Sequence, residues 1–274
     1  MDALGRVADW PVDAVAVGVV RLGLPGTCPS DTTGDTSQIH PWASVTKPAT
    51  ALAVLVAAEE GTLDLDEPAG PAGSTVRHLL AHASGVAFDA PIVRAAPGAR
   101  RIYSNAGYEM LADAVARAVG APFEQWLREA VLDPLGMTRT RLAGSPASGL
   151  VGPLADLVGL AGELQRPWLL RPESAAEMRA VAFPGLAGLL PGLGHQARND
   201  WGLGPEIRDA KAPHWTGTAN DASTFGHFGA AGGFVWVDPV AGVACACLTA
   251  TPFGPWARAA WPALADAVLA TAPR

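Results

Sequence analysis

The chain has 274 residues, of which 49% are hydrophobic and only 16% are charged. This composition is typical of one compact domain, or of one domain with an insertion, and it excludes a disordered or fibrous protein. The net charge is −7 and no cluster of basic residues occurs, so neither nucleic acid nor an anionic membrane is an expected partner.

The sequence predicts a cytoplasmic protein. Its first ten residues lack a basic start followed by an apolar run, so no secretory signal is visible. The longest apolar stretch, about Ala49 to Ala58, is too short to span a bilayer. Three cysteines, Cys28, Cys245 and Cys247, are an odd number and favour free thiols. A mature protein without its signal would have the same features.

The first third of the chain predicts a strand, a loop and a helix. Residues 12–20 are rich in β-branched side chains and predict a strand, whereas residues 23–34 are rich in Gly, Pro, Ser and Thr and predict a loop. Residues 44–60 predict a helix that Gly61 ends. Pro48 fits there, because the first turn of a helix has no hydrogen bond to lose at that position.

The middle third predicts a mostly helical region. Helices are expected at residues 74–81, 105–119, 122–132, 153–163 and 173–180. Gly and Pro dominate residues 184–204, which predicts a loop.

The last third predicts strands and a final helix. Strands are expected at residues 201–208, 225–229, 233–237 and 243–249, with a helix at 256–270. The element order predicts an α+β fold in a single domain, 1–274: a mainly antiparallel sheet is flanked by N- and C-terminal helices, and a helical insertion covers about 70–195.

Ser44 and Lys47 form a Ser-x-x-Lys motif at the start of the first predicted helix. Residues three apart lie on one helical face, so the hydroxyl and the amine can meet. A desolvated amine near a helix N-terminus can lose its proton near neutral pH and activate the serine. Lysine occurs only twice, at Lys47 and Lys211, among nineteen basic residues. A lysine at position 47 of such an arginine-rich chain is consistent with a site that needs a base, because arginine stays protonated and cannot act as one.

Two further motifs carry candidate site residues. Tyr103 and Asn105 form Tyr-x-Asn, in which the phenol can relay a proton and the amide can hold a substrate carbonyl or Lys47. His227 and Gly229 form His-x-Gly on a late predicted strand, and the amide of the next residue, Ala230, can join that of Ser44 in an oxyanion hole. Each motif alone also fits an ordinary structural role.

Together these motifs resemble the serine β-lactamase and penicillin-binding-protein superfamily, in the class C branch that includes family VIII esterases and D-aminopeptidase-like or amidase-like hydrolases. The order Ser-x-x-Lys, Tyr-x-Asn, His-x-Gly is the family's. Three more stretches agree: residues 78–85 (His-Leu-Leu-Ala-His-Ala-Ser-Gly), 97–98 (Pro-Gly) and 133–137 (Asp-Pro-Leu-Gly-Met). The resemblance implies the β-lactamase/transpeptidase-like fold, acylation of Ser44, proton transfer by Lys47 and Tyr103, and a pocket lined by Asn105 and His227.

Two departures from the family pattern favour a small ester or amide over a β-lactam as substrate. His227 stands where many β-lactamases have the lysine of Lys-Thr-Gly, and a histidine is a weaker, pH-dependent partner for a carboxylate. The chain is also short for the class C branch. The alternatives are an acyltransferase, a β-lactamase or D-Ala-D-Ala carboxypeptidase of the same fold, and a non-catalytic ligand-binding module.

No cofactor is expected. The sequence has no Gly-x-Gly-x-x-Gly or Walker motif, and the pair His78 and His82 has no evident third ligand for a metal. Trp42, Trp201 and Trp215 are candidates for the pocket wall. The predicted partner is a small-molecule ester or amide, and the oligomeric state is left open.

Overall fold

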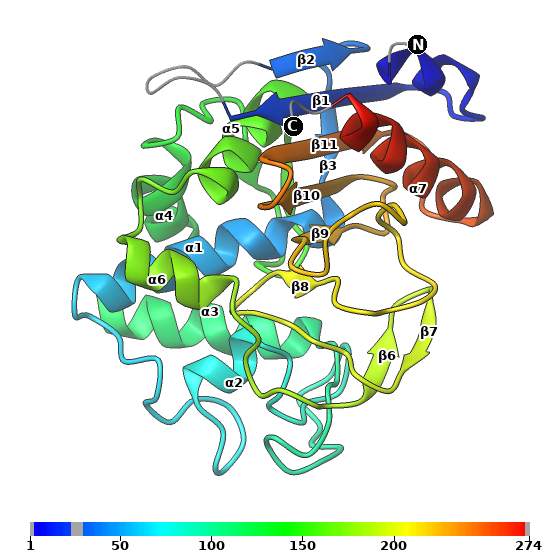
Figure 1. Cartoon of the computed structure of the whole chain (residues 1–274). Coiled ribbons are helices and arrows are strands. Elements are labelled where there is room, and N and C mark those ends of the chain that lie inside the picture. The colour runs from blue at the N-terminus through cyan, green and yellow to red at the C-terminus, as the bar shows by residue number, and fades with distance from the viewer. Residues whose placement is uncertain (1–2, 23–29, 272–274) are drawn as a thin grey trace.

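A six-stranded antiparallel sheet organises the protein (Figure 1). The computed structural model describes residues 3–22 and 30–271, so Cys28 lies outside the described residues. The strand order is β2-β1-β11-β10-β9-β8. The strands are β1 (Val15–Arg21), β2 (Ser30–Thr33), β8 (Glu206–Ile207), β9 (Phe225–Phe228), β10 (Phe234–Asp238) and β11 (Val243–Thr249).

Both faces of the sheet are buried, which explains why its central strands read as continuous apolar runs. Val17 and Val19 of β1 pack into the cluster under the C-terminal helix α7 (Pro255–Ala270), whereas Ala16 and Val20 face the opposite cluster. This alternation follows from the two-residue period of a strand. Cys245 and Cys247 are two apart on β11, both buried and both in the α7 cluster, so they share one strand face.

Three further helical elements cover the sheet. The 3₁₀ helix η1 (Leu4–Asp9) packs beside α7. On the opposite face lie α5 (Leu154–Gln165), against β11 and β1, and α1 (Thr46–Glu59), which touches β9. Almost every side chain of α1 is buried, as is typical of a central helix surrounded by other elements.

The remaining elements surround α1 or lie beyond it (Figure 1). The helices are α2 (Val76–Leu80), α3 (Asn105–Val119), α4 (Phe123–Leu127), the π-helical turn η3 (Arg128–Leu132) and α6 (Pro172–Met178). The strands are β3 (Ile39–Pro41), β4 (Arg141–Leu142) and β5 (Leu150–Pro153), in the order β3-β5-β4, and the hairpin β6 (Gly188–Leu190) and β7 (Gly194–Gln196).

Local sequence sets the ends of α3, the helix that positions two of the candidate site residues. Its first turn is capped by Ser104, whose Oγ accepts the amide of Gly107 at 2.8 Å. Its last turn is closed by Gly120, which has φ +71° in the left-handed region that glycine adopts without strain. These boundaries match the predicted helix at residues 105–119.

Several predictions of loops and strands were wrong. Residues 30–33, inside the predicted loop 23–34, form β2 and pair with β1; residues 23–29 lie outside the described part. The predicted loop 184–204 contains the β6–β7 hairpin. The predicted strand 201–208 is reduced to β8, two residues long at the sheet edge. The predicted helix 122–132 changes from α to π geometry at Arg128.

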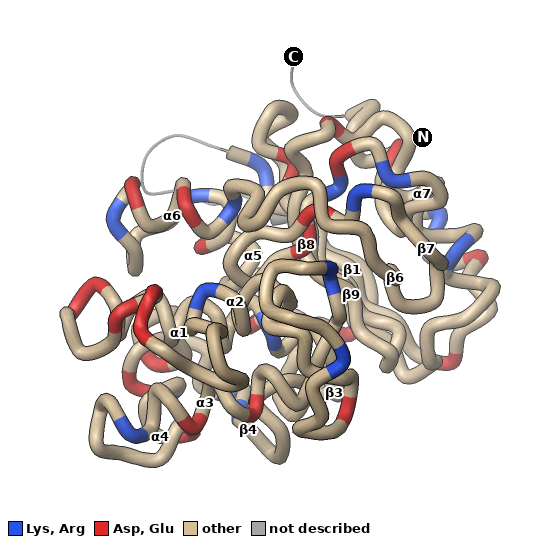
Figure 2. Tube along the Cα trace, turned by 90° about the horizontal axis from the view of Figure 1, so that it is seen from below, with Lys and Arg blue, Asp and Glu red and all other residues tan. Residues whose placement is uncertain are grey.

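That residues of about 70–195 form one inserted helical unit remains a prediction. Helix α5 falls inside that range, yet it packs directly on the main sheet. Acidic and basic residues are interspersed along the trace (Figure 2). Among the described helices, none is both long enough and apolar enough to cross a membrane.

Candidate active site

Ser44 lies in a short 3₁₀ turn, η2 (Ala43–Val45), that leads directly into α1. Its neighbour Ala43 has φ +46°, a left-handed conformation that is strained for any residue with a Cβ. The surrounding structure must hold this strain, and it turns the half-buried Ser44 into a cavity of about 220 Å³. The N-terminus of α1 points its backbone amides toward the same place, which favours negative charge there.

Lys47 is fully buried in the first turn of α1. Its Nζ donates to Oδ1 of Asn105 at 2.7 Å and to the carbonyl of Ala147 at 2.9 Å, and it lies 4.6 Å from the ring centre of Tyr103. Burial lowers the pKa of this amine well below its usual value, against an opposing effect of the carboxylates of Asp89 and Glu109. An amine held this way can take a proton from a neighbouring hydroxyl.

Tyr103 precedes α3 and lines the same cavity as Ser44. Its buried hydroxyl has no hydrogen-bond partner with good geometry among the described residues. Burial raises the pKa of this phenol, and the nearby Ser44 side chain opposes that shift. The hydroxyl is therefore protonated at ordinary pH and free to donate to a group that enters the cavity.

Asn105 serves Lys47 in the structure, which is one of its two predicted uses. While Oδ1 accepts from Lys47, the Nδ2 amide donates to Oδ1 of Asp89 at 2.8 Å. Both ends of the amide are engaged, so its orientation is fixed. This arrangement orients the Lys47 amine and uses one of the two N–H donors of the Asn105 amide.

The end of β9 approaches the nucleophile closely, and Gly229 permits this. A Cβ placed on Gly229 would lie 2.5 Å from the carbonyl oxygen of Trp42 and 3.2 Å from the amide nitrogen of Ser44. Any larger residue would push the strand away. Ala230 follows and lines the cavity with Ser44, and its carbonyl accepts the amide of Phe253 at 3.0 Å.

His227 is neutral in the structure, which corrects the expectation of a pH-dependent partner for a carboxylate. Its Nδ1 lies 2.7 Å from the carbonyl oxygen of Phe228 and so carries the hydrogen, whereas its Nε2 has no partner among the described residues. Burial, together with the charge of Lys47, lowers the pKa of His227 to about 3. The residue therefore offers an uncharged acceptor at any pH near neutrality.

The cavity also contains residues that the sequence did not single out. Of the three candidate tryptophans only Trp201 lines it; Trp42 is buried and donates to the carbonyl of Gly152, and Trp215 donates to Glu206. The unpredicted lining residues are Phe88, Leu190, Pro191, Gly192, Glu206, Phe228 and Phe253. Most come from loops and short strands without a motif, so local sequence gave no sign of them.

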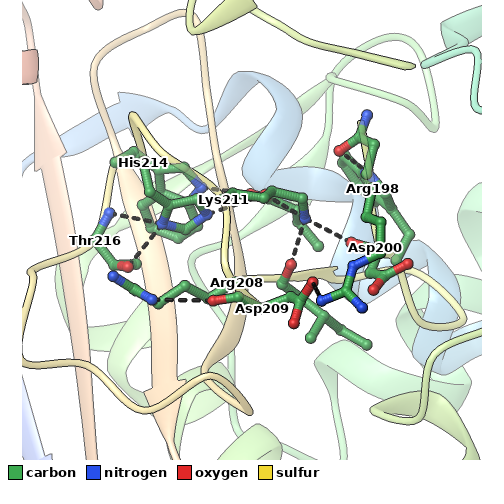
Figure 3. Close-up of polar contacts among 12 residues, drawn as sticks. Arg198, Asp200, Arg208, Asp209, Lys211, His214 and Thr216 are labelled. Atoms are coloured by element: carbon green, nitrogen blue, oxygen red, sulfur yellow. Dashed lines mark hydrogen bonds and ion pairs between the residues drawn. The ribbon is translucent and has the colours of Figure 1, made fainter. Parts of the chain in front are cut away.

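Glu206 is the one carboxylate among the described residues of the cavity wall, and its charge is balanced by groups behind it. Its Oε1 lies 2.9 Å from Nζ of Lys211 and 3.0 Å from Nε2 of His214. These charges hold the pKa of the carboxyl well below its usual range. Lys211 also donates to the carbonyls of Asp200 and Ile207, so its ammonium is saturated (Figure 3). Lys211 is thus structural, unlike Lys47.

His78 and His82, which lie four apart in the sequence, make separate contacts in the structure. His78 caps α2 through Thr75, with Nδ1 2.9 Å from the hydroxyl. His82 lies beyond the helix end, with φ +55°, and its ring packs 4.5 Å from that of Tyr103. Among the described residues, no three His, Cys, Asp or Glu side chains gather as metal ligands.

Comparison with known proteins assigns the family. Residues 32–270 match the family described as Beta-lactamase, and the chain therefore belongs to the beta-lactamase family. A solved structure described as a beta-lactamase (Mb2281c) from Mycobacterium bovis is 52% identical, with a TM-score of 0.94 over 98% of each chain. The predicted resemblance and fold class are confirmed.

More distant relatives have varied descriptions. A stretch of 54 residues is 44% identical to the D-alanyl-D-alanine-carboxypeptidase/endopeptidase AmpH of Escherichia coli strain K12, but it spans 20% of this chain and only 14% of that protein. EstCE1, described as a hydrolase with promiscuous acyltransferase activity, shares the fold at 19% identity, with a TM-score of 0.78 over 97% of this chain and 96% of that chain.

Proposed function

We propose that the protein is a serine hydrolase that cleaves a small ester or amide through an acyl-enzyme on Ser44. The observation that supports this best is the buried Lys47 amine, whose lowered pKa and fixed position suit a base one helical turn from the serine. Tyr103, Asn105, His227, Gly229 and Ala230 gather around the same two residues.

The proposed reaction has two halves. The Ser44 hydroxyl attacks the substrate carbonyl carbon while its proton passes to the neutral Lys47 amine. The negative oxygen of the tetrahedral intermediate lies between the amides of Ser44 and Ala230. When the bond to the leaving group breaks, that group takes a proton delivered through Tyr103, and Lys47 is neutral again. Water then attacks the acyl group with the same base, which releases the acid and restores Ser44.

The size and chemistry of the cavity support a small ester or amide. Its volume of about 220 Å³ suits a short group, and its wall is mostly apolar and aromatic. None of its lining residues is a lysine or arginine, and His227 is neutral. A β-lactam carboxylate would find no cation there, so antibiotic hydrolysis is the weaker alternative.

Acyl transfer is the second candidate activity. An alcohol or amine in place of water at the second step would give it without any other change in the site. The description of EstCE1, which shares the fold, names such an activity for that protein. Product analysis with an added alcohol distinguishes the two outcomes. Carboxypeptidase activity and ligand binding without catalysis remain further alternatives, and the cytoplasmic location remains a prediction.

A direct test compares wild type with Ser44→Ala on a short-chain p-nitrophenyl ester and a chromogenic cephalosporin. We expect turnover of the ester by wild type only, with little hydrolysis of the cephalosporin. Circular dichroism of both proteins checks that the variant is folded. Equal ester turnover in the two proteins would contradict the proposal, and efficient cephalosporin turnover would favour a β-lactamase.

A further inference from the structure

A second, larger hollow adjoins the cavity that contains Ser44. Its volume is about 640 Å³, and it shares Phe88, Tyr103 and Pro191 with the inner cavity. We call it the outer groove; its other lining residues are Ala87, Arg94, Arg100, Arg101, Ile102, Ala187, Gly188, Leu189 and His195. A substrate that reaches Ser44 through this opening would leave its far end in the outer groove.

The floor of the outer groove is preformed. The backbone amide of Arg101 donates to the carbonyl of Ala187 at 2.9 Å, and a Cβ placed on Gly188 would lie 2.4 Å from the carbonyl oxygen of Arg101. The buried Arg101 guanidinium donates to four carbonyls, including those of Asn199 at 3.0 Å and Ala182 at 2.8 Å. These bonds join the segment that leads to Tyr103 to the chain around the β6–β7 hairpin. Ligand binding in the groove therefore needs no rearrangement of its floor.

The opposite wall is tied to the catalytic helix α3. The amide of Asn105 donates to the carbonyl of Phe88 at 2.7 Å, and Ala87 donates to Ile92 at 2.8 Å. The Phe88 side chain is nevertheless 50% exposed, and Leu189 on the other wall is 65% exposed. Two large apolar side chains thus face solvent across a hollow that leads to the nucleophile, as expected of a site that contacts an apolar ligand.

Basic residues gather at this groove without acidic partners. Exposed Arg94, Arg100 and His195 line it, and its lining contains no aspartate or glutamate. Within the part of the chain that the structure describes, none of the three forms an ion pair. Arg100 donates to the carbonyl of Arg94 at 3.3 Å, which keeps the two side by side. In a chain of net charge −7, such a cluster favours an anionic ligand.

The inner cavity has the opposite character. Among the described residues that line it, only Glu206 is charged, and His227 is neutral. A carboxylate on the substrate is therefore disfavoured next to Ser44 and favoured in the outer groove. A substrate that places its reacting bond at Ser44 and its carboxylate in the outer groove needs an apolar spacer between the two. The apolar walls of the groove suit such a spacer.

We propose that the outer groove binds the far end of the substrate, an apolar segment that ends in a carboxylate. The preferred substrate class is then the half ester or half amide of a medium-chain dicarboxylic acid. Arg94, Arg100 and His195 would bind its free carboxylate. This inference rests on the proposed function, because it names the substrate of the same site.

The test compares p-nitrophenyl hexanoate with the mono-p-nitrophenyl esters of adipic and suberic acid. We expect higher kcat/KM for the half acids than for the hexanoate. This preference should fall about tenfold in the variant Arg94→Gln/Arg100→Gln. It should also weaken when the salt concentration rises from about 0.05 to about 0.5 M. The control is Arg117→Gln/Arg166→Gln, which removes the same charge at exposed arginines that line neither hollow. Equal kcat/KM for acid and neutral esters, unchanged by the groove variant, would overturn the proposal.

A binding measurement separates this proposal from the proposed function. Calorimetric titration of Ser44→Ala with monomethyl suberate needs no turnover. Binding that weakens in the added Arg94→Gln/Arg100→Gln background, but not in the control background, supports the groove even if wild type hydrolyses no ester. No difference among the three backgrounds counts against the groove even if hydrolysis at Ser44 is demonstrated.

Discussion

Nζ of Lys47 lies 2.7 Å from Oδ1 of Asn105, and the Asn105 amide is in turn held by Asp89. The first turns of α1 and α3 are therefore joined at the amine beside the nucleophile. Asp89 also counteracts, through its charge, the burial that lowers the pKa of Lys47. Asn105 thus helps to position the amine, together with the carbonyl of Ala147, and Asp89 helps to set its basicity.

Replacing the base by a side chain that stays protonated should remove activity. In Lys47→Arg the guanidinium stays protonated at any ordinary pH, so it cannot accept the Ser44 proton. We expect kcat for ester hydrolysis to fall about 10²–10⁴-fold, the usual contribution of a general base. Thermal unfolding monitors whether the buried site accommodates arginine. Arg77→Lys, the reverse exchange at an ion pair outside the cavity, is the control. A folded Lys47→Arg protein with near wild-type kcat would exclude Lys47 as the base.

The pH dependence of activity should follow the free amine. Burial lowers the pKa of Lys47 well below 10.5, so the active neutral form increases as pH rises and is present at a lower pH than for an exposed lysine. We expect kcat/KM to rise with pH to a plateau, with a midpoint well below 10.5. In Asp89→Asn the supporting charge is lost, so the midpoint should move to lower pH. A midpoint that stays fixed, or that moves upward, argues against this electrostatic link.

Acid should destabilise the fold through its buried neutral histidines. Burial lowers the pKa of His227 to about 3 and that of His82 well below its usual value of 6.5. Between about pH 6.5 and pH 3 the unfolded chain binds a proton at His227 that the folded chain does not, and His82 acts in the same direction. The stability contributed by the neutral His227 is therefore fully present above pH 6.5 and falls by about 1.4 kcal/mol per pH unit below it. Urea unfolding at about pH 7.5 and pH 5.5 should show a smaller pH effect in His227→Gln than in wild type.

A methyl group at position 229 should separate the strand from the nucleophile. In Gly229→Ala the Cβ would lie 2.5 Å from the Trp42 carbonyl oxygen, and relief of this overlap would move the amides of Ser44 and Ala230 apart. We expect kcat to fall about 10²-fold, the size of a lost oxyanion donor, and stability to fall by about 1–3 kcal/mol. Gly144→Ala is the matched control, because its nearest atom would be 3.9 Å away. Equal kinetics in the two variants would refute the close-approach argument.

The buried and exposed ion pairs of Figure 3 should differ sharply in their effect on stability. Glu206→Gln leaves the fully buried Lys211 ammonium without its counter-charge, which costs about 3–5 kcal/mol. Asp209→Asn breaks the more exposed pair with Arg198, which costs about 0–1 kcal/mol. Chemical denaturation measures both free energies of unfolding. Comparable losses in the two variants would contradict the structural role given to Lys211.

The sequence predicted correctly those features that depend on residues close together along the chain. Ser44 and Lys47 are three residues apart, so their placement on one helical segment needed only local structure, and the caps around α3 fixed its start at Asn105. The strand β2 and the β6–β7 hairpin lie in Gly- and Pro-rich stretches and form because partners exist elsewhere in the fold. Short edge strands depend on such partners more than on their own residues, so their sequence predicted loops.

Burial explains the other errors. His227 was expected to be a weaker, pH-dependent partner for a carboxylate, but it is buried and its Nδ1 is bound to a backbone carbonyl. Glu206 reaches the cavity only through β8, a strand of two residues. Neither the exclusion of water nor the position of a single edge residue can be derived from neighbours in sequence.

The central claim is that Ser44 carries the acyl group, and intact-mass spectrometry tests it most directly. A p-nitrophenyl ester is mixed with wild type and with Ser44→Ala, and both are quenched in acid before deacylation is complete. The account predicts a mass increase equal to one acyl group in wild type, located by proteolysis on the peptide that contains Ser44, and no increase in Ser44→Ala. An adduct on another residue, or ester turnover that persists in Ser44→Ala, would contradict it.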